Sequence, residues 1–221
     1  DHLGRCIFSR IIFGLRISLF IGLAVVAFSS LFGTILGGAA GYFGGVLDEV
    51  VMRLVDAFLS FPSIFLALAV IGFLGSGLNN LMLSLILVEW TGYSRLARSS
   101  VLSLKGKEFL EAARSLGGSD FYIISRHILP NVLPPVLVMA TLSVGYAILG
   151  IASLSFLGLG VQPPTPEWGS MMNDARPFLR SHPLMMIFPG MAITITVLAF
   201  HLLGDGIREK LNPRSMNEKQ L

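Results

Sequence analysis

Residues 108–130, with the sequence EFLEAARSLGGSDFYIISRHILP, form a polar stretch between two long apolar regions. The stretch is too polar to cross a bilayer, and a glycine pair divides it into two halves. In the first half, apolar residues recur at the i, i+3, i+4, i+7 spacing of one helix face, which indicates a short amphipathic helix. These apolar residues are Phe109, Ala112, Ala113 and Leu116.

The second half predicts another short helix directly after the glycine pair, Gly117-Gly118, which is typical of a helix C-terminus. Ser119 can cap the new helix, and Asp120 in its first turn is favoured by the helix dipole. Its predicted apolar face consists of Phe121, Ile124 and Ile128. We therefore expect two short helices joined by a glycine elbow across the mouth of a bundle, with one face left for a partner. An amphipathic helix resting on the bilayer surface is the alternative.

The rest of the chain is strongly apolar. Of its 221 residues, 53% are hydrophobic and only 13% are charged, whereas a soluble domain carries about 25% charged residues. No Asp, Glu, Lys or Arg occurs in four stretches, 17–47, 57–88, 127–166 and 181–204. This pattern excludes disordered, coiled-coil, nucleic-acid-binding and disulfide-rich secreted proteins as classes for the whole chain. It predicts an all-α polytopic membrane protein.

The charge-free stretches predict the membrane spans, because a helix needs about 20 apolar residues to cross the hydrocarbon core. The second stretch is interrupted by the turn-forming residues 75–80 and therefore predicts two spans. The five predicted spans are 18–42, 59–75, 79–96, 133–157 and 185–203.

The loop charges predict the orientation. Loop 91–126 carries six Lys or Arg residues and the segment after Asp205 carries four, but loop 158–184 carries two. The positive-inside rule then places residues 97–130 and the tail 205–221 in the cytoplasm. The transmembrane domain covers 18–204, and residues 1–17 become an external segment before the first span. A five-span chain with an external start leads us to expect a sixth span upstream, so that the sequence is a fragment.

The polar loop resembles the EAA motif of ABC importer permeases. That motif runs Glu-Ala-Ala, three residues, Gly, nine residues, Ile-x-Leu-Pro. This chain has Glu111-Ala112-Ala113, Gly117 and His127-Ile128-Leu129-Pro130 at the same spacing. One position departs, because His127 stands where the general motif has isoleucine, although the run His-Ile-Leu-Pro-Asn is similar to the peptide-permease branch.

Other segments resemble the dipeptide, oligopeptide and nickel permeases. Residues 1–10 are similar to the segment before that family's second span, with Cys6 in place of a common acidic residue. Residues 155–160 and 163–169 resemble its fifth span and external loop. Gly204-Asp205-Gly206 with Asn212-Pro213-Arg214 resembles its C-terminal end. The family has six spans per subunit, which agrees with the expected upstream span.

The resemblance implies a type I ABC importer transmembrane domain that forms half of a pore for di- or oligopeptides. Nickel or a metal chelate is the alternative cargo. The implied partners are a sister permease in a heterodimer, two cytoplasmic ATPase subunits and an extracytoplasmic binding protein, in the inner membrane of a bacterial or archaeal cell. No G-x-x-x-x-G-K-[ST] phosphate loop is present, so ATP and Mg are expected on the ATPase subunits. This subunit is expected to be no enzyme and to bind no cofactor.

The resemblance also implies roles for individual residues. Glu111 would contact the ATPase, the small side chains of Ala112 and Ala113 would allow close seating, and Gly117 would permit the turn between the two helices. The full set of expected docking residues is Glu111, Ala112, Ala113, Gly117, His127, Leu129 and Pro130.

Glu89 is the one acidic residue within a predicted span. A carboxylate there is costly and faces a pore or a partner by default. We therefore interpret Glu89 as lining the pathway, as pairing at the subunit interface, or as lying nearer the cytoplasmic rim.

Three further patterns favour structural explanations. The glycines at 33, 37, 38 and 41 predict a close helix-packing seam. The charged residues of 48–56 predict a solvated helix face, with a partner contact as the alternative. The methionines and histidines of 171–201 show no consistent ligand spacing, so no metal site is predicted.

Two other classes of protein remain as alternatives. One is a secondary transporter, for which no inverted repeat is found in the sequence, and the other is an assembly subunit without a pore.

Overall fold

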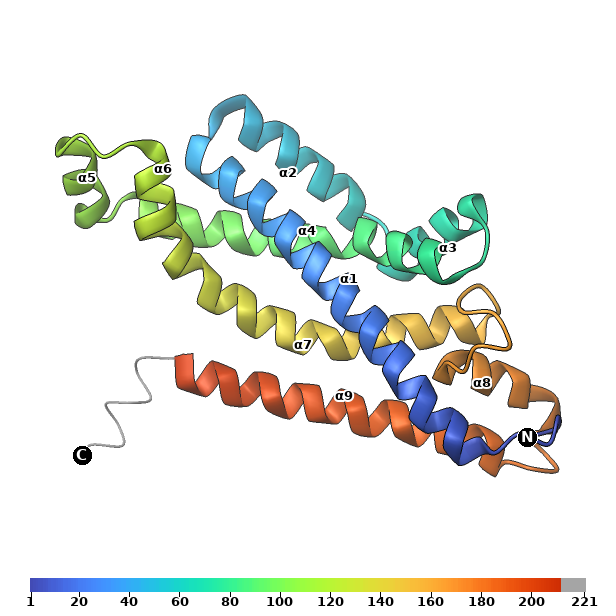
Figure 1. The fold of residues 1–221 in the computed structure, drawn as a ribbon. Coiled ribbons are helices and arrows are strands. Elements are labelled where there is room, and N and C mark those ends of the chain that lie inside the picture. Colours follow the sequence, from blue (N-terminus) through green and yellow to red (C-terminus); the bar gives the residue numbers. More distant parts are fainter. Residues whose placement is uncertain (212–221) are drawn as a thin grey trace.

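The computed structural model describes residues 1–211, and in this range the chain is built from helices and loops (Figure 1). The long helices are α1 (Ile7–Phe43), α4 (Leu78–Lys105), α7 (Leu129–Phe156) and α9 (Leu184–Leu211). The shorter ones are α2 (Gly45–Leu59), α3 (Ser63–Leu74), α5 (Glu108–Ser115), α6 (Asp120–Ile123) and α8 (Trp168–Ala175). A π-helical turn (Ile124–Ile128) joins α6 to α7, and a 3₁₀ turn (Arg176–Phe178) follows α8. The predicted motif residues Asn212-Pro213-Arg214 lie outside the described residues.

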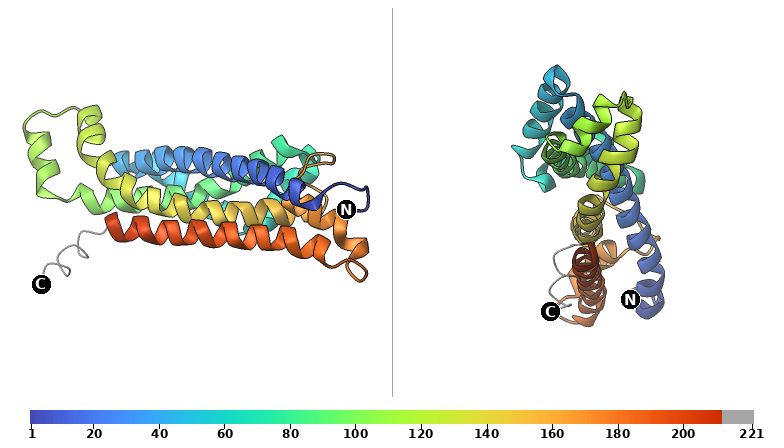
Figure 2. Two further views of the ribbon diagram at one scale, coloured as in Figure 1. Left: turned by 60° about the horizontal axis from the view of Figure 1, so that its bottom comes forward. Right: turned by 90° about the vertical axis from the view of Figure 1, so that its left-hand side faces the viewer.

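The long helices form one elongated bundle, and the connecting segments gather at its two ends (Figure 2). Helices α5 and α6 and the end of α9 lie at one end, whereas the N-terminus, α3 and α8 lie at the other. This grouping is the one that the loop charges predict. Which end faces the cytoplasm stays a prediction.

The number of spans differs from the prediction. Three segments of the described chain are long and apolar enough to cross a membrane, namely Ile7–Phe43, Asp120–Phe156 and Leu184–Leu211. Helices α2 and α3 qualify only together, as a broken span bent by 91°. With 12 residues, α3 alone is about 18 Å long, which is short of the hydrocarbon core of about 30 Å. The count of five spans is therefore not confirmed, and the predicted span 59–75 is interrupted at residues 60–62.

The first helix begins earlier than predicted. Residues 7–17 were expected in an external segment, but they form the first turns of α1. The expectation followed from the start of the charge-free stretch at residue 17 and from the alternation of the spans. Arg10 is only 8% exposed, and its guanidinium lies 3.4 Å from Asp1 and 3.8 Å from Asp174. These acidic partners allow the helix to continue through a buried charge.

The predicted glycine seam joins α1 to α4, which form the most extensive helix pair in the bundle. A Cβ atom at Gly37 would come within 2.0 Å of the Ser94 carbonyl oxygen, and one at Gly33 within 2.3 Å of the Trp90 carbonyl oxygen. Gly41 also faces α4, whereas a Cβ at Gly38 would meet nothing within 4 Å. Small residues let helix backbones approach this closely. The seam is confirmed for three of the four glycines and is wrong for Gly38.

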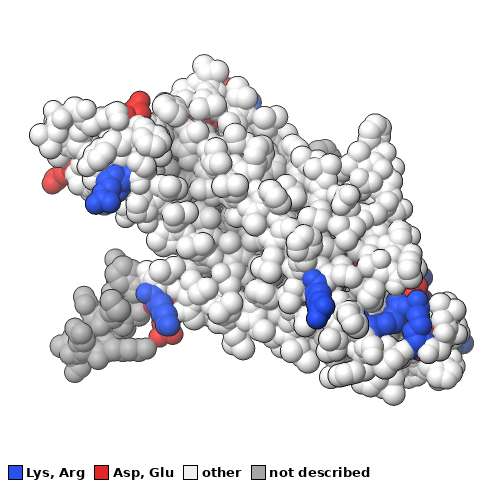
Figure 3. Space-filling model, viewed as in Figure 1, with Lys and Arg blue, Asp and Glu red and all other residues white. Residues whose placement is uncertain are grey.

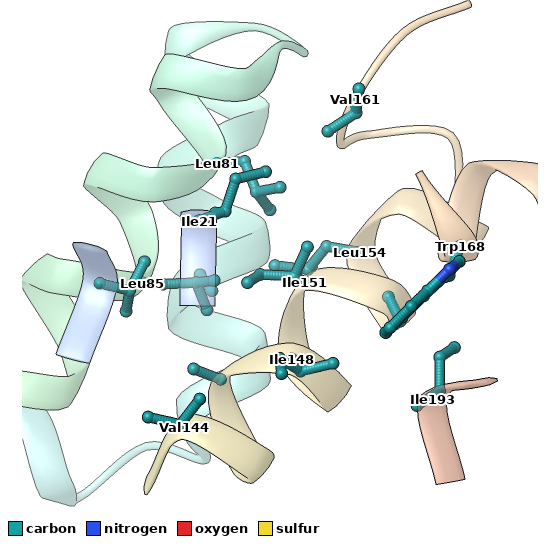
Figure 4. Close-up of a cluster of buried hydrophobic side chains, with 14 of the residues drawn as sticks. Ile21, Leu81, Leu85, Val144, Ile148, Ile151, Leu154, Val161, Trp168 and Ile193 are labelled. Atoms are coloured by element: carbon teal, nitrogen blue, oxygen red, sulfur yellow. The ribbon is translucent and has the colours of Figure 1, made fainter. Parts of the chain in front are cut away.

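A core of branched aliphatic side chains fills the space between α1, α4, α7 and α8 (Figure 4). Trp168 is 1% exposed, and its Nε1 donates to the carbonyl oxygen of Ile11 over 3.1 Å. Glu167 is fully buried and caps α8 by accepting from the backbone N–H groups of Gly169 and Ser170, both at 2.9 Å. These contacts hold the 158–183 segment against α1.

Large apolar side chains cover much of the outer surface, particularly on α1 and α9. On the face drawn in Figure 3, the charged side chains lie mainly toward the ends of the molecule, and the area between them is almost uncharged. An uncharged belt of this kind fits a protein that is surrounded by lipid and by neighbouring subunits.

The acidic segment of α2 is tied to α4. Arg98 donates from Nε and Nη2 to the two oxygens of Asp48, over 2.5 and 2.7 Å, and Arg95 donates to Asp56 over 2.5 Å. The Glu49–Arg53 pair remains exposed on the α2 surface. The predicted solvated face is therefore correct for Glu49 and Asp56, whose side chains are 64% and 63% exposed, and wrong for Asp48, whose side chain is 21% exposed.

Replacing Asp48 with asparagine should lower the free energy of unfolding by about 1–2 kcal/mol, because a bidentate, charge-assisted contact becomes a weaker neutral one. Glu49→Gln is the matched control on the same helix and should cost less than about 0.5 kcal/mol, since its ion pair is exposed. Unfolding in mixed detergent micelles measures both values. Equal effects of the two substitutions would contradict this account.

Candidate coupling loop and central cavity

The EAA loop, predicted within residues 97–130, contains the lobe made by α5 and α6 (Figure 1), whereas its first nine residues belong to α4 and its last two to α7. Leu110 anchors α5 in a buried cluster with residues of α4 and α7, and it is only 1% exposed. Most of the predicted apolar stripe lies on the other side of α5. Phe109 and Ala112 are exposed there, and Leu116 is 89% exposed. The helix thus has one anchored side and one apolar side that is open to a partner.

The glycine elbow is present as predicted. Gly117 has a φ of +82°, which favours glycine strongly. The N–H of Gly118 donates to the Ala113 carbonyl over 3.0 Å and closes the end of α5. Ser119 caps α6 by accepting from the N–H of Tyr122 over 3.3 Å.

Tyr42, at the end of α1, holds the elbow from the bundle side. Its hydroxyl donates to Asp120 over 2.5 Å, and the Arg114 guanidinium lies over its ring, 5.6 Å from the centroid. Lys105 at the end of α4 donates to the Tyr42 carbonyl over 2.8 Å. These contacts connect both short helices to α1 and α4. Sequence reasoning did not find Tyr42, because 78 residues separate it from Asp120 and no local pattern joins them.

The second half of the loop packs differently from the prediction. Ile128 is buried, but Phe121 of the same predicted face is 81% exposed, and Ile123, which was not assigned to that face, is buried. The cause is the π-helical turn at Ile124–Ile128, which inserts extra backbone and changes the helical register.

His127, the position that departs from the general motif, braces the two halves of the loop. Its ring lies 6.0 Å from the ring of Phe109 in α5 and 5.6 Å from that of Tyr122 in α6. Its carbonyl oxygen accepts from Asn131 at 2.6 Å. An aromatic side chain here keeps α5 and α6 in a fixed relation.

Replacing His127 with alanine should loosen the lobe, since contacts between ring pairs contribute about 0.5–1.5 kcal/mol each. We expect hydrogen exchange of residues 108–123 to become several-fold faster, while exchange in α1 and α7 stays unchanged. His127→Phe keeps an aromatic ring and should restore slow exchange. If the phenylalanine variant exchanges as fast as the alanine variant, the ring contacts are not what holds the lobe.

The other expected docking residues surround this lobe. Glu111 is exposed and makes no ion pair within residues 1–211. Ala113 is half-buried, and Leu129 and Pro130 lie exposed at the start of α7. The motif therefore forms one partly open surface at the end of the bundle rather than a buried site.

A cavity of about 900 Å³ opens between α3, α4, α7 and α9. Its walls are mainly apolar, and they include one carboxylate, Glu89 of α4, and one guanidinium, Arg208 of α9. The hydroxyl-bearing residues Ser63, Ser143 and Tyr146 also line it. Glu89 therefore faces an open space in this subunit. In the described part of the chain, no three His, Cys, Asp or Glu side chains are grouped to hold a metal ion.

A family model described as the inner membrane component of binding-protein-dependent transport systems matches residues 30–217. The chain belongs to this family. It is a multi-pass inner-membrane permease subunit of the ABC importer class, as the loop motif implies. It is 46% identical to the dipeptide transport system permease DppC of Alkalihalophilus pseudofirmus, over 97% of this chain and 70% of the relative.

Two other relatives show the range of named cargo within the family. The permease is 46% identical to the glutathione transport system permease GsiD of Pectobacterium atrosepticum, over 97% of this chain and 71% of the relative. It is 43% identical to the nickel transport system permease NikC of Escherichia coli K12, over 99% of this chain and 79% of the relative. The fold is similar to the MetNI methionine ABC transporter in an inward-facing conformation, with a TM-score of 0.68, 21% identity and coverage of 90% of this chain and 96% of that one.

Proposed function

We propose that this permease forms half of the translocation pore of an ATP-driven importer of di- or oligopeptides. The sister permease supplies the other half, two ATPase subunits dock on the loops of the two permeases, and an extracytoplasmic binding protein delivers the cargo. The observation that carries the proposal is the anchored loop with its open apolar side, at the spacing of the coupling motif. The relatives named for dipeptide and glutathione transport support peptides as the cargo.

The loop has the properties of a lever. The open side of α5 offers Phe109, Ala112 and Leu116 to a cleft in the ATPase, and Glu111 adds a charge for its rim. Movement of the ATPase would reach the bundle through contacts on the anchored side, which are the packing of Leu110 and the hydrogen bond from Tyr42 to Asp120. A short stiff helix held on one side transmits force better than a mobile loop.

Nickel is the second candidate cargo, because the nickel relative is covered over 79% of its length at 43% identity. One experiment separates the two. The permease, its sister, the ATPases and the binding protein are reconstituted in proteoliposomes, and uptake of labelled dialanine and of nickel is measured.

We expect dialanine uptake only when ATP is present on the ATPase side and the ATPase subunits are included. Uptake of nickel without dialanine would assign the alternative cargo. Uptake driven by an ion gradient without ATPase subunits would show that the importer assignment is wrong and that the protein is a secondary transporter.

A further inference from the structure

The cavity between α3, α4, α7 and α9 is lined by one negative and one positive side chain, in surroundings that are mainly apolar. Glu89 belongs to α4 and Arg208 to α9. Glu89 lies within a predicted span, where a charged group is costly and usually has a partner or a function, whereas Arg208 is exposed near the end of α9. Neither residue forms an ion pair with another part of the described chain.

The other charged residues of α4 do have partners. Arg95 and Arg98 of α4 are paired with Asp56 and Asp48 of α2, and Lys105 donates to a backbone carbonyl. In contrast, Glu89 forms no ion pair within residues 1–211 and lines the cavity. On α4, the three basic residues are therefore partnered, whereas the carboxylate that lines the cavity is not.

The helix contacts give the relative height of the two charges along the bundle. Gly92 of α4 faces Met139 of α7, and Gly204 of α9 faces Leu142 of α7. Since Met139 and Leu142 are three residues apart, these two contacts lie within one turn of each other, or about 5 Å. Glu89 lies about one turn before Gly92, and Arg208 lies about one turn after Gly204. Because α4 and α9 both run in the opposite direction to α7, Glu89 lies near the level of Leu142 and Arg208 near the level of Val138, about 6 Å apart along the bundle.

We infer that the cavity holds a short zwitterionic peptide, with its ammonium group at Glu89 and its carboxylate at Arg208. An extended dipeptide spans about 7 Å, which is comparable to the offset between the two levels, and the apolar walls suit varied side chains. Arg208 can bind a carboxylate through two parallel hydrogen bonds. Glu89 excludes anionic groups from its own level. This inference rests on the proposed function, because it assigns the peptide-contacting residues of the same pathway.

The test uses the complete transporter in lipid nanodiscs and a photoreactive dipeptide, benzoylphenylalanyl-alanine. It is applied with free ends, with an acetylated amino end, and with an amidated carboxyl end. Labelling of α4 and α7 is measured by mass spectrometry for the wild type, Glu89→Gln, Arg208→Gln and the control Glu49→Gln, whose carboxylate is exposed on α2. The two cavity variants keep nearly the same side-chain shape, and their ATPase activity confirms assembly.

We expect Glu89→Gln to reduce labelling by the free dipeptide about tenfold or more, and to leave labelling by the acetylated form unchanged. Arg208→Gln should likewise reduce labelling by the free dipeptide about tenfold or more, and it should leave labelling by the amidated form unchanged. Glu49→Gln should have no effect. If Glu89→Gln reduces labelling by the free and acetylated forms equally, or reduces neither, the inference is wrong and the carboxylate serves the subunit interface.

Failure of the proposed function would look different. A wild-type transporter that imports no dialanine in the proteoliposome assay overturns both the peptide assignment and this inference. The wild-type transporter can also import dialanine while Glu89→Gln has the same effect on labelling by the free and the acetylated dipeptide. This result overturns the inference alone.

Discussion

Replacing Gly37 with leucine is expected to prevent α1 from packing against α4, with the largest loss of stability of any single substitution proposed for this permease. A Cβ at Gly37 would lie 2.0 Å from the carbonyl oxygen and 2.6 Å from the Cα of Ser94. Both are backbone atoms, so no side-chain rotation relieves the clash, and the two helices must separate. Overpacking of a core costs about 1–3 kcal/mol even where side chains can adjust, and we expect more than about 3 kcal/mol here.

Gly38→Leu is the matched control, because it lies on the same helix one residue away and a Cβ there meets nothing within 4 Å. The amount of folded, detergent-extractable permease and its free energy of unfolding are measured for both variants. Gly38→Leu should be close to the wild type, whereas Gly37→Leu should yield little folded protein. Similar yields for the two would contradict the α1–α4 seam.

The second large effect is expected from Gly117→Pro, which should abolish transport while leaving the bundle folded. Proline fixes φ near −65°, but residue 117 requires a φ of +82°. The substitution also removes the N–H that donates to the Arg114 carbonyl over 2.9 Å. Because the elbow sets the relation of α5 to α6, the exposed side of α5 would no longer face its partner correctly.

The measurements for this variant are dialanine uptake and ATP hydrolysis in the reconstituted transporter. We expect dialanine uptake to fall below about one tenth of the wild-type rate. ATP hydrolysis should no longer be coupled to uptake, and membrane insertion should be normal. Gly106→Ala is the control within the same loop, because Gly106 has a φ of −93° and an added Cβ meets nothing within 4 Å. Normal uptake by Gly117→Pro would show that the elbow does not transmit force.

Features that depend on local sequence were predicted well. The elbow at Gly117, the cap at Ser119 and the small-residue spacing of Gly33, Gly37 and Gly41 each follow from a short pattern with one physical cause. The same is true of Glu89, because a single acid in an apolar stretch stands out without any knowledge of its neighbours. The structure places it at a cavity, which was one of the interpretations that the sequence left open.

Features that depend on distant partners were predicted poorly. The start of the first helix at Ile7 was not predicted, because the helix carries the buried Arg10, and one of its acidic partners, Asp174, lies far along the chain. Tyr42 was missed as the brace of the loop for the same reason. The break between α2 and α3 carried a local signal, since a residue before proline is disfavoured in a helix. Phe61-Pro62 was nevertheless treated as lying within an apolar run.

The buried face of the loop shows a further limit. Periodicity placed Phe121 and Ile128 on one apolar face, but the π-helical turn after Ile123 changes the register, so that Ile128 is buried and Phe121 is exposed. Periodicity arguments assume a regular α-helix of 3.6 residues per turn. They therefore fail wherever the backbone departs from that geometry.

The most direct test of the account is photocross-linking from position 111 in the assembled transporter. Benzoylphenylalanine replaces Glu111, and in a separate variant it replaces Phe73, which is 91% exposed at the opposite end of the bundle. After illumination, adducts are identified by mass spectrometry. We predict an adduct with an ATPase subunit from position 111 and none from position 73. If position 111 gives no ATPase adduct, or if the two positions give it equally, the loop is not the docking site.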